Sequence, residues 1–344
     1  MKATTKIRKI KTTIITAALT LAAAFTLTAC GDNAGADADY KVAIVKYVDD
    51  ASLNQIEDAI IAQIEAKEKE LGVTIDVQKY NGQADGTILN QIAAEVVADD
   101  VDVVVPIATP AAVLMQSATE GTDIKVVFSA VSDPVGAGLV ASNDAPGSNV
   151  TGVSDAIDTK AIMDLILLQN PDIKSIGLLY DKGQASSTAS IADAKAYCAS
   201  KGINVVEKTG TNTSEVQAAA DALVAEGVEA IFTPQDNTIM VAELSIFEKF
   251  TEAKIPHYTG ADSFALNGAF LGYGVNYVNL GTLTADMVID VTVNGANPAT
   301  TAVKTLDDGI IMVNTETATT LGIDYNIFKD SCSELKTTVT KQEF

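Results

Sequence analysis

The feature that most constrains the fold is an alternation of short apolar strands with amphipathic helices, which begins at Tyr40. Runs such as "VDVVVP" at 101–106 and "VEAIFT" at 228–233 are apolar and β-branched, and a helical pattern follows each of them. Strand, helix and strand at this spacing build parallel sheets that are covered by helices on both faces. The sequence therefore predicts an α/β fold.

The apolar periodicity gives approximate positions for these elements. Strands are expected near 41–46, 73–79, 101–106, 125–130, 174–180, 203–208, 228–233, 255–259 and 269–273. Helices are expected near 52–71, 87–98, 111–119, 158–169, 187–201, 213–226, 239–253 and 279–294.

A weak internal similarity indicates two lobes rather than one large sheet. "VDVVVPIATPAAVLMQSA" followed by "IKVVFSAVSDP" has the same plan as "VEAIFTPQDNTIMVAELS" followed by "IPHYTGADSFA". The length of 344 residues also exceeds that of a usual single domain. We predict two Rossmann-like lobes with parallel sheets, joined by a three-segment hinge near Val153–Ile157, Gly274–Asn276 and 299–304.

The predicted organisation divides the chain as follows. Residues 1–29 are a signal peptide, 30–39 a tether, 40–153 with 276–300 the first lobe, 154–275 with 301–328 the second lobe, and 329–344 a C-terminal tail.

The N-terminus is typical of an export signal. Five basic residues and no acidic one fall within residues 1–29, and the apolar run "TTIITAALTLAAAFTLTA" follows. A membrane-spanning helix of borderline length is the alternative, but small residues crowd the point where cleavage would fall. "LTAC", ending at Cys30, resembles the lipobox of bacterial lipoproteins, in which this cysteine is lipidated and anchors the exported domain to the membrane.

Charge excludes one class of partner. Without residues 1–29 the chain has 18 basic against 45 acidic residues, a formal charge of −27, so nucleic acid would be repelled. Of the other cysteines, Cys198 is in helical step with Ile191 and Ala194 and is expected to pack in the core; a disulfide with Cys332 stays open.

Catalytic and cofactor motifs find little support. The single histidine, His257, follows Pro256 in a short strand and is best explained as structural. No serine lies in a G-x-S-x-G elbow, and "GQADG" and "GAGL" lack the spacing and the lysine of a phosphate loop. The acidic doublets lack EF-hand spacing. We expect no enzymatic activity, no cofactor and no metal.

The loops after the predicted strands point to a small ligand, because ligands of open parallel sheets bind beyond the C-terminal strand ends. These loops are rich in Ser, Thr, Asp and Asn, with Lys46 and Lys182 as basic exceptions. Backbone N–H groups from about Thr109 to Val113 favour an anion at the start of a helix. Asp236, at the matching strand end of the other lobe, suits an ammonium group. The opposed charges describe an amino acid; a plain N-cap at Thr109 and a turn or cap at Asp236 are the alternatives.

Seven segments, in order, resemble the ABC-transporter substrate-binding proteins of the tryptophan/tyrosine type. They are "VAIVKYVDDASLN", "DVVVPIATPAA", "VFSAVSDPVGAGLV", "NVTGVSD", "IGLLYD", "PQDNT" and "LGYGVNYVNLG". The resemblance runs from Tyr40 to about Ile323. It implies the type I periplasmic-binding fold and capture of a small solute, often an aromatic amino acid, for a membrane permease.

The resemblance also implies positions for the ligand-binding residues. Thr109, Ala111 and Ala112 would lie near the ligand carboxylate, Ser129, Ser132 and Asp133 in the cleft, Ser154 and Asp155 at the hinge, and Tyr180, Asp236 and Asn237 in the second lobe. The chain departs from the family where a His-Pro pair is replaced by Asp50-Ala51, and where Asn-Ser is replaced by Ser186-Ser187. With Asp262 of the loop Gly260–Ser263, these residues complete the candidate site.

The resulting hypothesis is a lipid-anchored, extracytoplasmic solute receptor of an ABC importer, monomeric, which closes its hinge on an amine- and carboxylate-bearing ligand. A surface sensor that passes a binding signal to a membrane receptor is the alternative. An extra acid at Asp50 would disfavour an anionic ligand and favour a second positive charge.

Overall fold

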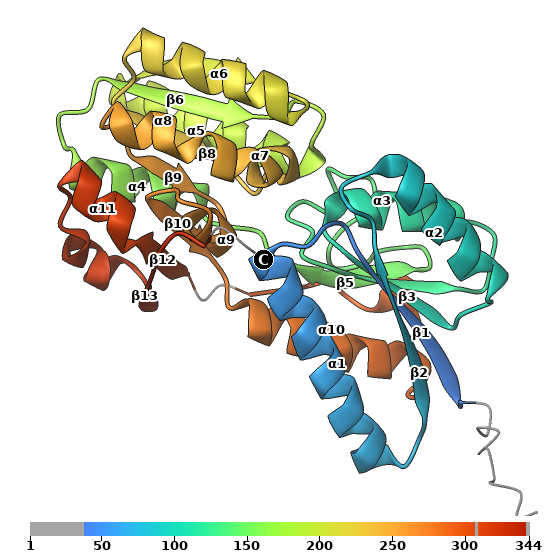
Figure 1. Ribbon diagram of the computed structural model, residues 1–344. Coiled ribbons are helices and arrows are strands. Elements are labelled where there is room, and N and C mark those ends of the chain that lie inside the picture. The colour runs from blue at the N-terminus through green and yellow to red at the C-terminus, as the bar shows by residue number, and fades with distance from the viewer. Residues whose placement is uncertain (1–37, 307–308, 342–344) are drawn as a thin grey trace, which may run out of the picture. The chain divides into compact units, whose positions relative to one another are not determined.

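The computed structural model describes residues 38–306 and 309–341 (Figure 1). The predicted signal peptide, the lipidation site Cys30 and most of the tether lie outside these residues. The described elements are arranged around two β-sheets within one compact unit that begins at Ala38.

The first sheet has the strand order β11-β5-β4-β3-β1-β2, and all of its strands are parallel. Its strands are β1 (Tyr40–Lys46), β2 (Ile75–Asn81), β3 (Val103–Ile107), β4 (Lys125–Ser129), β5 (Val150–Ser154) and β11 (Lys304–Thr305). The helices that follow these strands or pack on them are α1 (Ala51–Leu71), α2 (Gly86–Ala98), α3 (Thr109–Ala118) and α10 (Tyr277–Thr292), together with the 3₁₀ turn η2 (Pro298–Thr300). We call this set the first lobe.

Side-chain alternation along β1 explains why this sheet is covered on both faces. Val42 and Ile44 belong to a core cluster with Ile56 of α1 and Leu280 of α10. The intervening Ala43 and Val45 pack on the opposite face with residues of α2 and α3. Figure 1 shows α1 and α10 lying side by side, away from α2 and α3.

The second sheet has the order β13-β12-β10-β9-β8-β6-β7. Its strands are β6 (Ser175–Tyr180), β7 (Asn204–Thr209), β8 (Ala230–Thr233), β9 (His257–Thr259), β10 (Leu271–Gly274), β12 (Ile310–Asn314) and β13 (Glu334–Thr338). The helices are α4 (Thr159–Gln169), α5 (Ala185–Lys201), α6 (Thr213–Glu226), α7 (Asn237–Ala242), α8 (Phe247–Glu252), α9 (Asp262–Leu266) and α11 (Thr315–Leu321), with the 3₁₀ segments η1 (Glu243–Ser245) and η3 (Tyr325–Ser331). We call this set the second lobe.

The predicted α/β class with two lobes is confirmed, with one exception to parallel pairing: β10 and β12 run antiparallel. The chain crosses between the lobes after β5, after β10 and after β11. The third crossing lies between β11 and β12 rather than at 299–304, because Lys304 and Thr305 pair with Val153 and Ser154 of the first sheet. Residues 301–305 were therefore assigned to the wrong lobe.

The predicted C-terminal tail is also corrected, because residues 334–338 form the edge strand of the second sheet. This strand, β13, pairs in parallel with β12 from Ile310 to Asn314. The segment "ELKTT" shows no apolar alternation and is only partly buried, so its sequence carried no strand signal.

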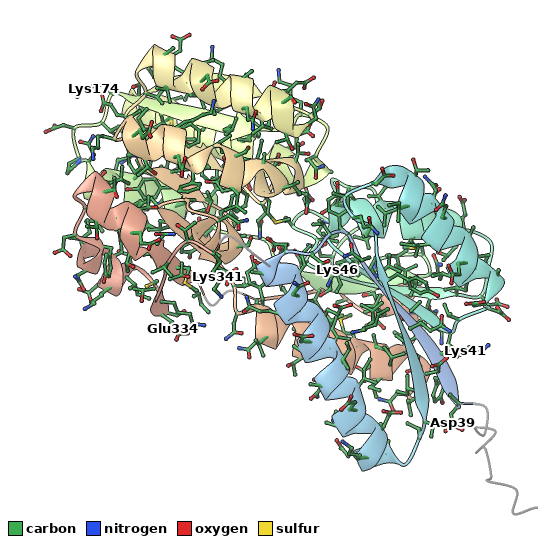
Figure 2. All side chains as sticks on the ribbon, in the orientation of Figure 1. Asp39, Lys41, Lys46, Lys174, Glu334 and Lys341 are labelled. Carbon is green, nitrogen blue, oxygen red and sulfur yellow. The ribbon has the colours of Figure 1, made fainter. Side chains whose placement is uncertain are left out.

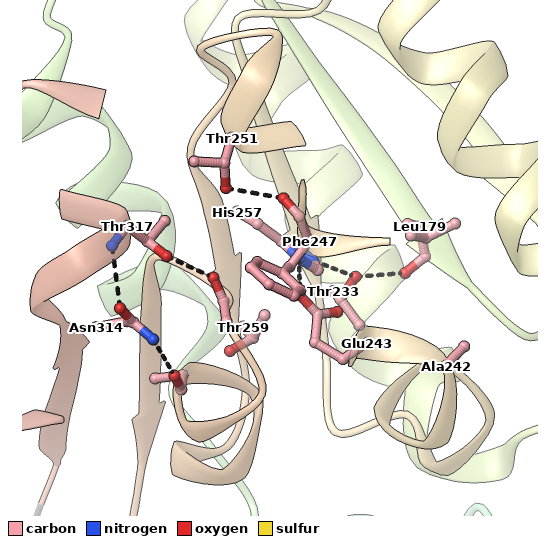
Figure 3. A network of polar contacts seen from close by, with 12 residues as sticks. Leu179, Thr233, Ala242, Glu243, Phe247, Thr251, His257, Thr259, Asn314 and Thr317 are labelled. Atoms are coloured by element: carbon pink, nitrogen blue, oxygen red, sulfur yellow. Dashed lines mark hydrogen bonds and ion pairs between the residues drawn. The ribbon is translucent and has the colours of Figure 1, made fainter. Parts of the chain in front are cut away.

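The expected helix 239–253 is broken into α7, η1 and α8, and a buried polar network lies at the break. The Glu243 carboxylate is fully buried and lies 3.0 Å from Nδ1 of His257. Nε2 of His257 lies 2.8 Å from the Thr233 hydroxyl, which itself donates to the carbonyl of Leu179 (Figure 3). Since the Thr233 proton is used on Leu179, His257 must donate from Nε2, and one proton lies between Nδ1 and Glu243. The network ties the break to β8, β9 and β6, which supports the structural reading of His257.

We predict that Glu243→Ala lowers the free energy of unfolding by about 1–3 kcal/mol, because Nδ1 of buried His257 loses its partner. Glu243→Gln should lose less, since its amide can still donate to Nδ1. Chemical denaturation checks both values. The control is Lys249→Ala, which removes an exposed ion pair with Asp221 and should cost about 0–1 kcal/mol. A Glu243→Ala loss no larger than that of the control would contradict the assignment.

Candidate ligand-binding site

A cavity lies between the two lobes, where the loops after β1, β3, β4 and β8 meet the crossings after β5 and β10. Its lining is made of Asp50, Ser52, Leu53, Ala108, Thr109, Ala130, Ser132, Asp155, Ser186, Gln235, Asp236, Asn237, Met240, Ala261, Ser263, Phe264 and Tyr277. The cavity volume is about 30 Å³, or about 400 Å³ when space open to solvent is included. Hydrogen bonds between the lobes lie beside the cavity, such as Ser52 to Asp262 and Gln235 to the backbone of Asp155.

The start of α3 forms one wall of the cavity. Ala108 precedes the helix with φ 79° and ψ 152°, a backbone region that side chains other than glycine rarely adopt. Its side chain offers no cap, and Pro110 has no amide proton, so the first turn of α3 presents the N–H groups of Thr109 and Ala111 without a side-chain acceptor. Such a helix end favours an anion, and Ala108 and Thr109 both line the cavity.

Asp155 lies at the first crossing between the lobes and is acidic, so it favours a cation where the start of α3 favours an anion. It is 5 % exposed, and its Oδ1 accepts a 3.0 Å hydrogen bond from the Ser132 hydroxyl of the first lobe. Its backbone carbonyl accepts a hydrogen bond from Nε2 of Gln235 in the second lobe. Burial raises the pKa of the Asp155 carboxyl to about 6, against the smaller opposing effect of the Ser132 bond. A cationic group beside it would restore the charged form.

Asp236 differs from its expected role, because its carboxylate is occupied by protein donors. Oδ1 caps α7 by accepting from the amides of Thr238 and Ile239, and Oδ2 accepts from the amide of Asp181 and the hydroxyl of Ser187. Four bonds fill the usual capacity of a carboxylate. Burial still raises its pKa to about 6. The alternative of a cap residue therefore describes Asp236 better than the expectation of a main ammonium partner.

Asp50 caps α1 and faces an acid of the other lobe. Its Oδ1 accepts from the amides of Ser52 and Leu53. Burial, followed by the field of Asp262, raises the pKa of Asp50 to about 6. Asp262 accepts a 2.6 Å hydrogen bond from the Ser52 hydroxyl, which joins the second lobe to the first turn of α1. Burial likewise raises the pKa of Asp262.

Lys46, the basic exception noted in the first strand-end loop, is not available to these acids. It is buried at the end of β1 (Figure 2), where its ammonium bonds Glu57 at 2.8 Å and Asn54 at 2.6 Å. It also pairs with Asp49 at 2.9 Å. None of the residues that line the cavity is a lysine, arginine or histidine.

Three buried polar atoms of the lining have no hydrogen-bond partner among the described residues. They are the hydroxyl of Ser186, which is 3 % exposed, Oε1 of Gln235, which is 8 % exposed, and the hydroxyl of Ser263, which is fully buried. Such groups are rare in folded chains and mark places where a further partner binds. Gln235 was missed in the sequence although it lies in the quoted "PQDNT" segment. Tyr277, within "LGYGVNYVNLG", was missed because a tyrosine at the start of a helix is typical of a core residue.

The structure brings about half of the predicted site residues into the cavity. Those in the lining are Asp50, Thr109, Ser132, Asp155, Ser186, Asp236 and Asn237. Those outside it are Ala111, Ala112, Ser129, Asp133, Ser154, Tyr180, Ser187 and Asp262. The latter have other contacts: for example, Ala111 and Ala112 pack in the first lobe, Ser129 bonds Thr284, and the Tyr180 hydroxyl bonds Glu207.

Two further expectations concern other residue types. Cys198 is buried beside Ile191 and Ala194 as expected, and both Cys198 and Cys332 are free thiols. Within the described ranges, no cluster of three or more His, Cys, Asp or Glu side chains could hold a metal ion. No helix in that part of the chain is long and apolar enough to cross a membrane.

Two α/β lobes, three crossings and a polar cavity between the lobes define a solute-binding protein of the type I periplasmic fold. The family described as ABC transporter substrate binding protein matches residues 41–331, and the chain belongs to it. Over 302 residues the chain is 30% identical to a tyrosine-binding protein of Clostridioides difficile (strain R20291), covering 85% of this chain and 86% of that protein.

Two solved structures resemble the chain over most of its length. The first, from Streptococcus pneumoniae in complex with L-Trp, is 30% identical and has a TM-score of 0.79, covering 86% of this chain and 99% of the other. The second is a ligand-free, open substrate-binding protein with adhesive properties from Clostridium difficile, also 30% identical, with a TM-score of 0.67 over 88% of this chain and 100% of the other.

We predict that the free energy of unfolding without ligand depends on the charge of Asp155. Its pKa is raised to about 6, so Asp155 in the folded chain takes up a proton as the pH falls through 6. In the unfolded chain the same carboxyl takes up the proton only near pH 4. This contribution therefore makes the chain more stable as the pH falls from 7 to 5, by about 1 kcal/mol. In Asp155→Asn that contribution is lost, whereas in Asp133→Asn, outside the cavity, it stays. Denaturation at both pH values measures the difference, and equal slopes in all three proteins would contradict it.

Proposed function

We propose that the chain is the extracytoplasmic solute-binding component of an ABC importer, which captures an amino acid between its lobes by hinge closure. The observation that carries the proposal is the pairing, in one enclosed cavity, of an uncapped helix start at Thr109 with the buried carboxylate of Asp155. An anion and a cation on one small molecule match these two walls.

The carboxylate of the ligand would bind at the first turn of α3. The contact of one anion with a helix N-terminus contributes about 0.3–1 kcal/mol when exposed and up to about 2 kcal/mol when partly buried. That is too little for tight binding, but it orients the ligand. The unusual backbone of Ala108 supports this role, because it directs the chain from β3 into α3 without a side-chain cap that would compete for the amides.

The ammonium group of the ligand would bind Asp155, whose carboxylate has spare acceptor capacity, unlike that of Asp236. A charge-assisted bond in a site closed to water contributes about 1.5–3 kcal/mol. Asp155 also touches both lobes through Ser132 and Gln235, so a ligand at this residue favours the closed arrangement. Binding and closure would thus share one residue.

The relatives support an amino acid as ligand, since one is described as tyrosine-binding and another was solved with L-Trp. An enzymatic role has little support from the lining, because no histidine or lysine stands beside its serines to act as a base. We further propose that lipidated Cys30 anchors a monomer outside the membrane, where the closed lobes meet a permease.

We predict that Asp155→Asn weakens binding of the cognate amino acid about 10- to 100-fold, because a charge-assisted hydrogen bond to its ammonium group is replaced by a neutral one. Calorimetric titration of the full chain measures the dissociation constant. Asp133→Asn is the matched control, since Asp133 bonds the amide of Gly136 outside the cavity. Affinity retained in Asp155→Asn, or lost equally in the control, would refute the role of Asp155.

A further inference from the structure

A zwitterionic ligand does not neutralise the negative charge of the cavity lining. Asp50, Asp155 and Asp236 contribute three buried carboxylates, and the lining contains no basic residue. An amino acid with a neutral side chain brings one positive and one negative charge, which leaves the excess of acid unchanged. Buried carboxylates are costly unless they are paired or hydrogen-bonded, so the compensation of each acid decides what the cavity can hold.

That compensation is unequal among the three acids. Asp236 accepts four hydrogen bonds from the protein. Asp155 has the Ser132 hydroxyl on Oδ1 and is assigned above to the α-ammonium group of the ligand. Asp50 has two amide bonds on Oδ1, one of them long at 3.4 Å, and the nearby Ser263 hydroxyl also favours its charged form. These groups leave room on Oδ2 for a further donor.

The surroundings of Asp50 add negative rather than positive potential. Asp262 approaches from α9 and its field acts on Asp50, while Lys46 is held by Glu57, Asp49 and Asn54. The hydroxyl of Tyr277 lies in the same neighbourhood: its pKa is raised by burial and then by Asp155, Asp262 and Asp50. A positive charge near Asp50 would be stabilised more strongly in this buried site than in water.

The unpartnered polar atoms of the lining provide a further indication. Oε1 of Gln235 can only accept a hydrogen bond, and it lacks a donor although its residue is 8 % exposed. The hydroxyls of Ser186 and Ser263, which are 3 % and 0 % exposed, are also unpartnered. All three residues line the cavity. Beyond the α-ammonium group that every amino acid shares, the side chain of tryptophan or tyrosine offers one donor, whereas a second ammonium group offers three.

We infer that the ligand carries a second cationic nitrogen, which pairs with Asp50 and donates to the free acceptors of the lining. This inference rests on the proposed function and specifies its ligand as an amino acid with a basic, unbranched side chain, such as ornithine or lysine. The chain would thus differ in specificity from its tyrosine- and tryptophan-binding relatives.

The experiment is a calorimetric titration of the full chain with ornithine, lysine, tyrosine, tryptophan and the diamine putrescine. We expect ornithine or lysine to bind at least 10-fold more tightly than either aromatic amino acid. Tighter binding of tyrosine or tryptophan would overturn the inference and leave the proposed function standing. Binding of putrescine alone would support the second cation and overturn the amino-acid assignment. If no amino acid bound, the proposed function itself would fail.

Asp50→Asn removes the charge of the side chain and keeps the helix cap, since Asn caps helices as well as Asp does. It should weaken ornithine or lysine at least 10-fold and leave the aromatic amino acids unchanged or tighter. Asp85→Asn is the matched control, because Asp85 caps α2 through the amides of Thr87 and Ile88 in the same lobe, outside the cavity. Asp50→Ser gives a second neutral cap should Asp50→Asn fold poorly, as judged by thermal unfolding. Equal affinities for the basic ligands in wild type and both Asp50 variants would overturn the inference.

Discussion

The buried carboxylate of Asp155 is the group on which the arrangement of the cavity depends. It lies where the chain leaves the first sheet after β5, so backbone geometry places it between the lobes in any closed state. Its contacts with Ser132 and Gln235 come from opposite lobes. Because burial disfavours its charge, a cation or a proton at this carboxyl stabilises the present arrangement of the lobes. A ligand with a cationic group at Asp155 would therefore favour this arrangement.

The same residue type has three different roles around the cavity. Asp236 and Asp50 each cap a helix that follows a strand, yet only Asp236 has its carboxylate filled by protein donors. Asp155 caps no helix and has a single side-chain donor. The difference arises from neighbours that are remote in sequence, such as Asp181 and Ser187 beside Asp236. The fold thus decides how many donors each acidic residue at a strand end receives and how much acceptor capacity it keeps.

Direct hydrogen bonds connect the two lobes beside the cavity. The chain is equally identical, at 30%, to the tryptophan complex and to the open ligand-free protein, and its TM-score is higher with the former. Contacts such as Ser52 with Asp262 exist only when the lobes meet. They join the first turn of α1 to α9 and contribute to closure apart from any ligand. The repulsion between Asp50 and Asp262 acts against them.

Much of the fold followed from local pattern. Strands such as β1 and β3 are β-branched and apolar on both faces, so burial between two helical layers was the only stable solution. Several strands were not predicted: the polar β13 gains its strand conformation only from pairing with β12, and β5 and β12 were missed although they are largely buried. The break after α7 was missed as well, because it depends on the fit of Glu243 to His257 and not on a helix breaker.

The sequence by itself determined the class of fold, the strand-end loops that could hold a ligand and the acidic character of those loops. Only the tertiary structure decided which loop residues meet in one cavity, because contacts such as Gln235 with Asp155 span 80 residues of chain. It also decided which acids remain uncompensated, since hydrogen-bond donors come from elements that no local pattern connects. Charge and periodicity are local properties, whereas burial and the satisfaction of polar groups exist only once the chain has closed on itself.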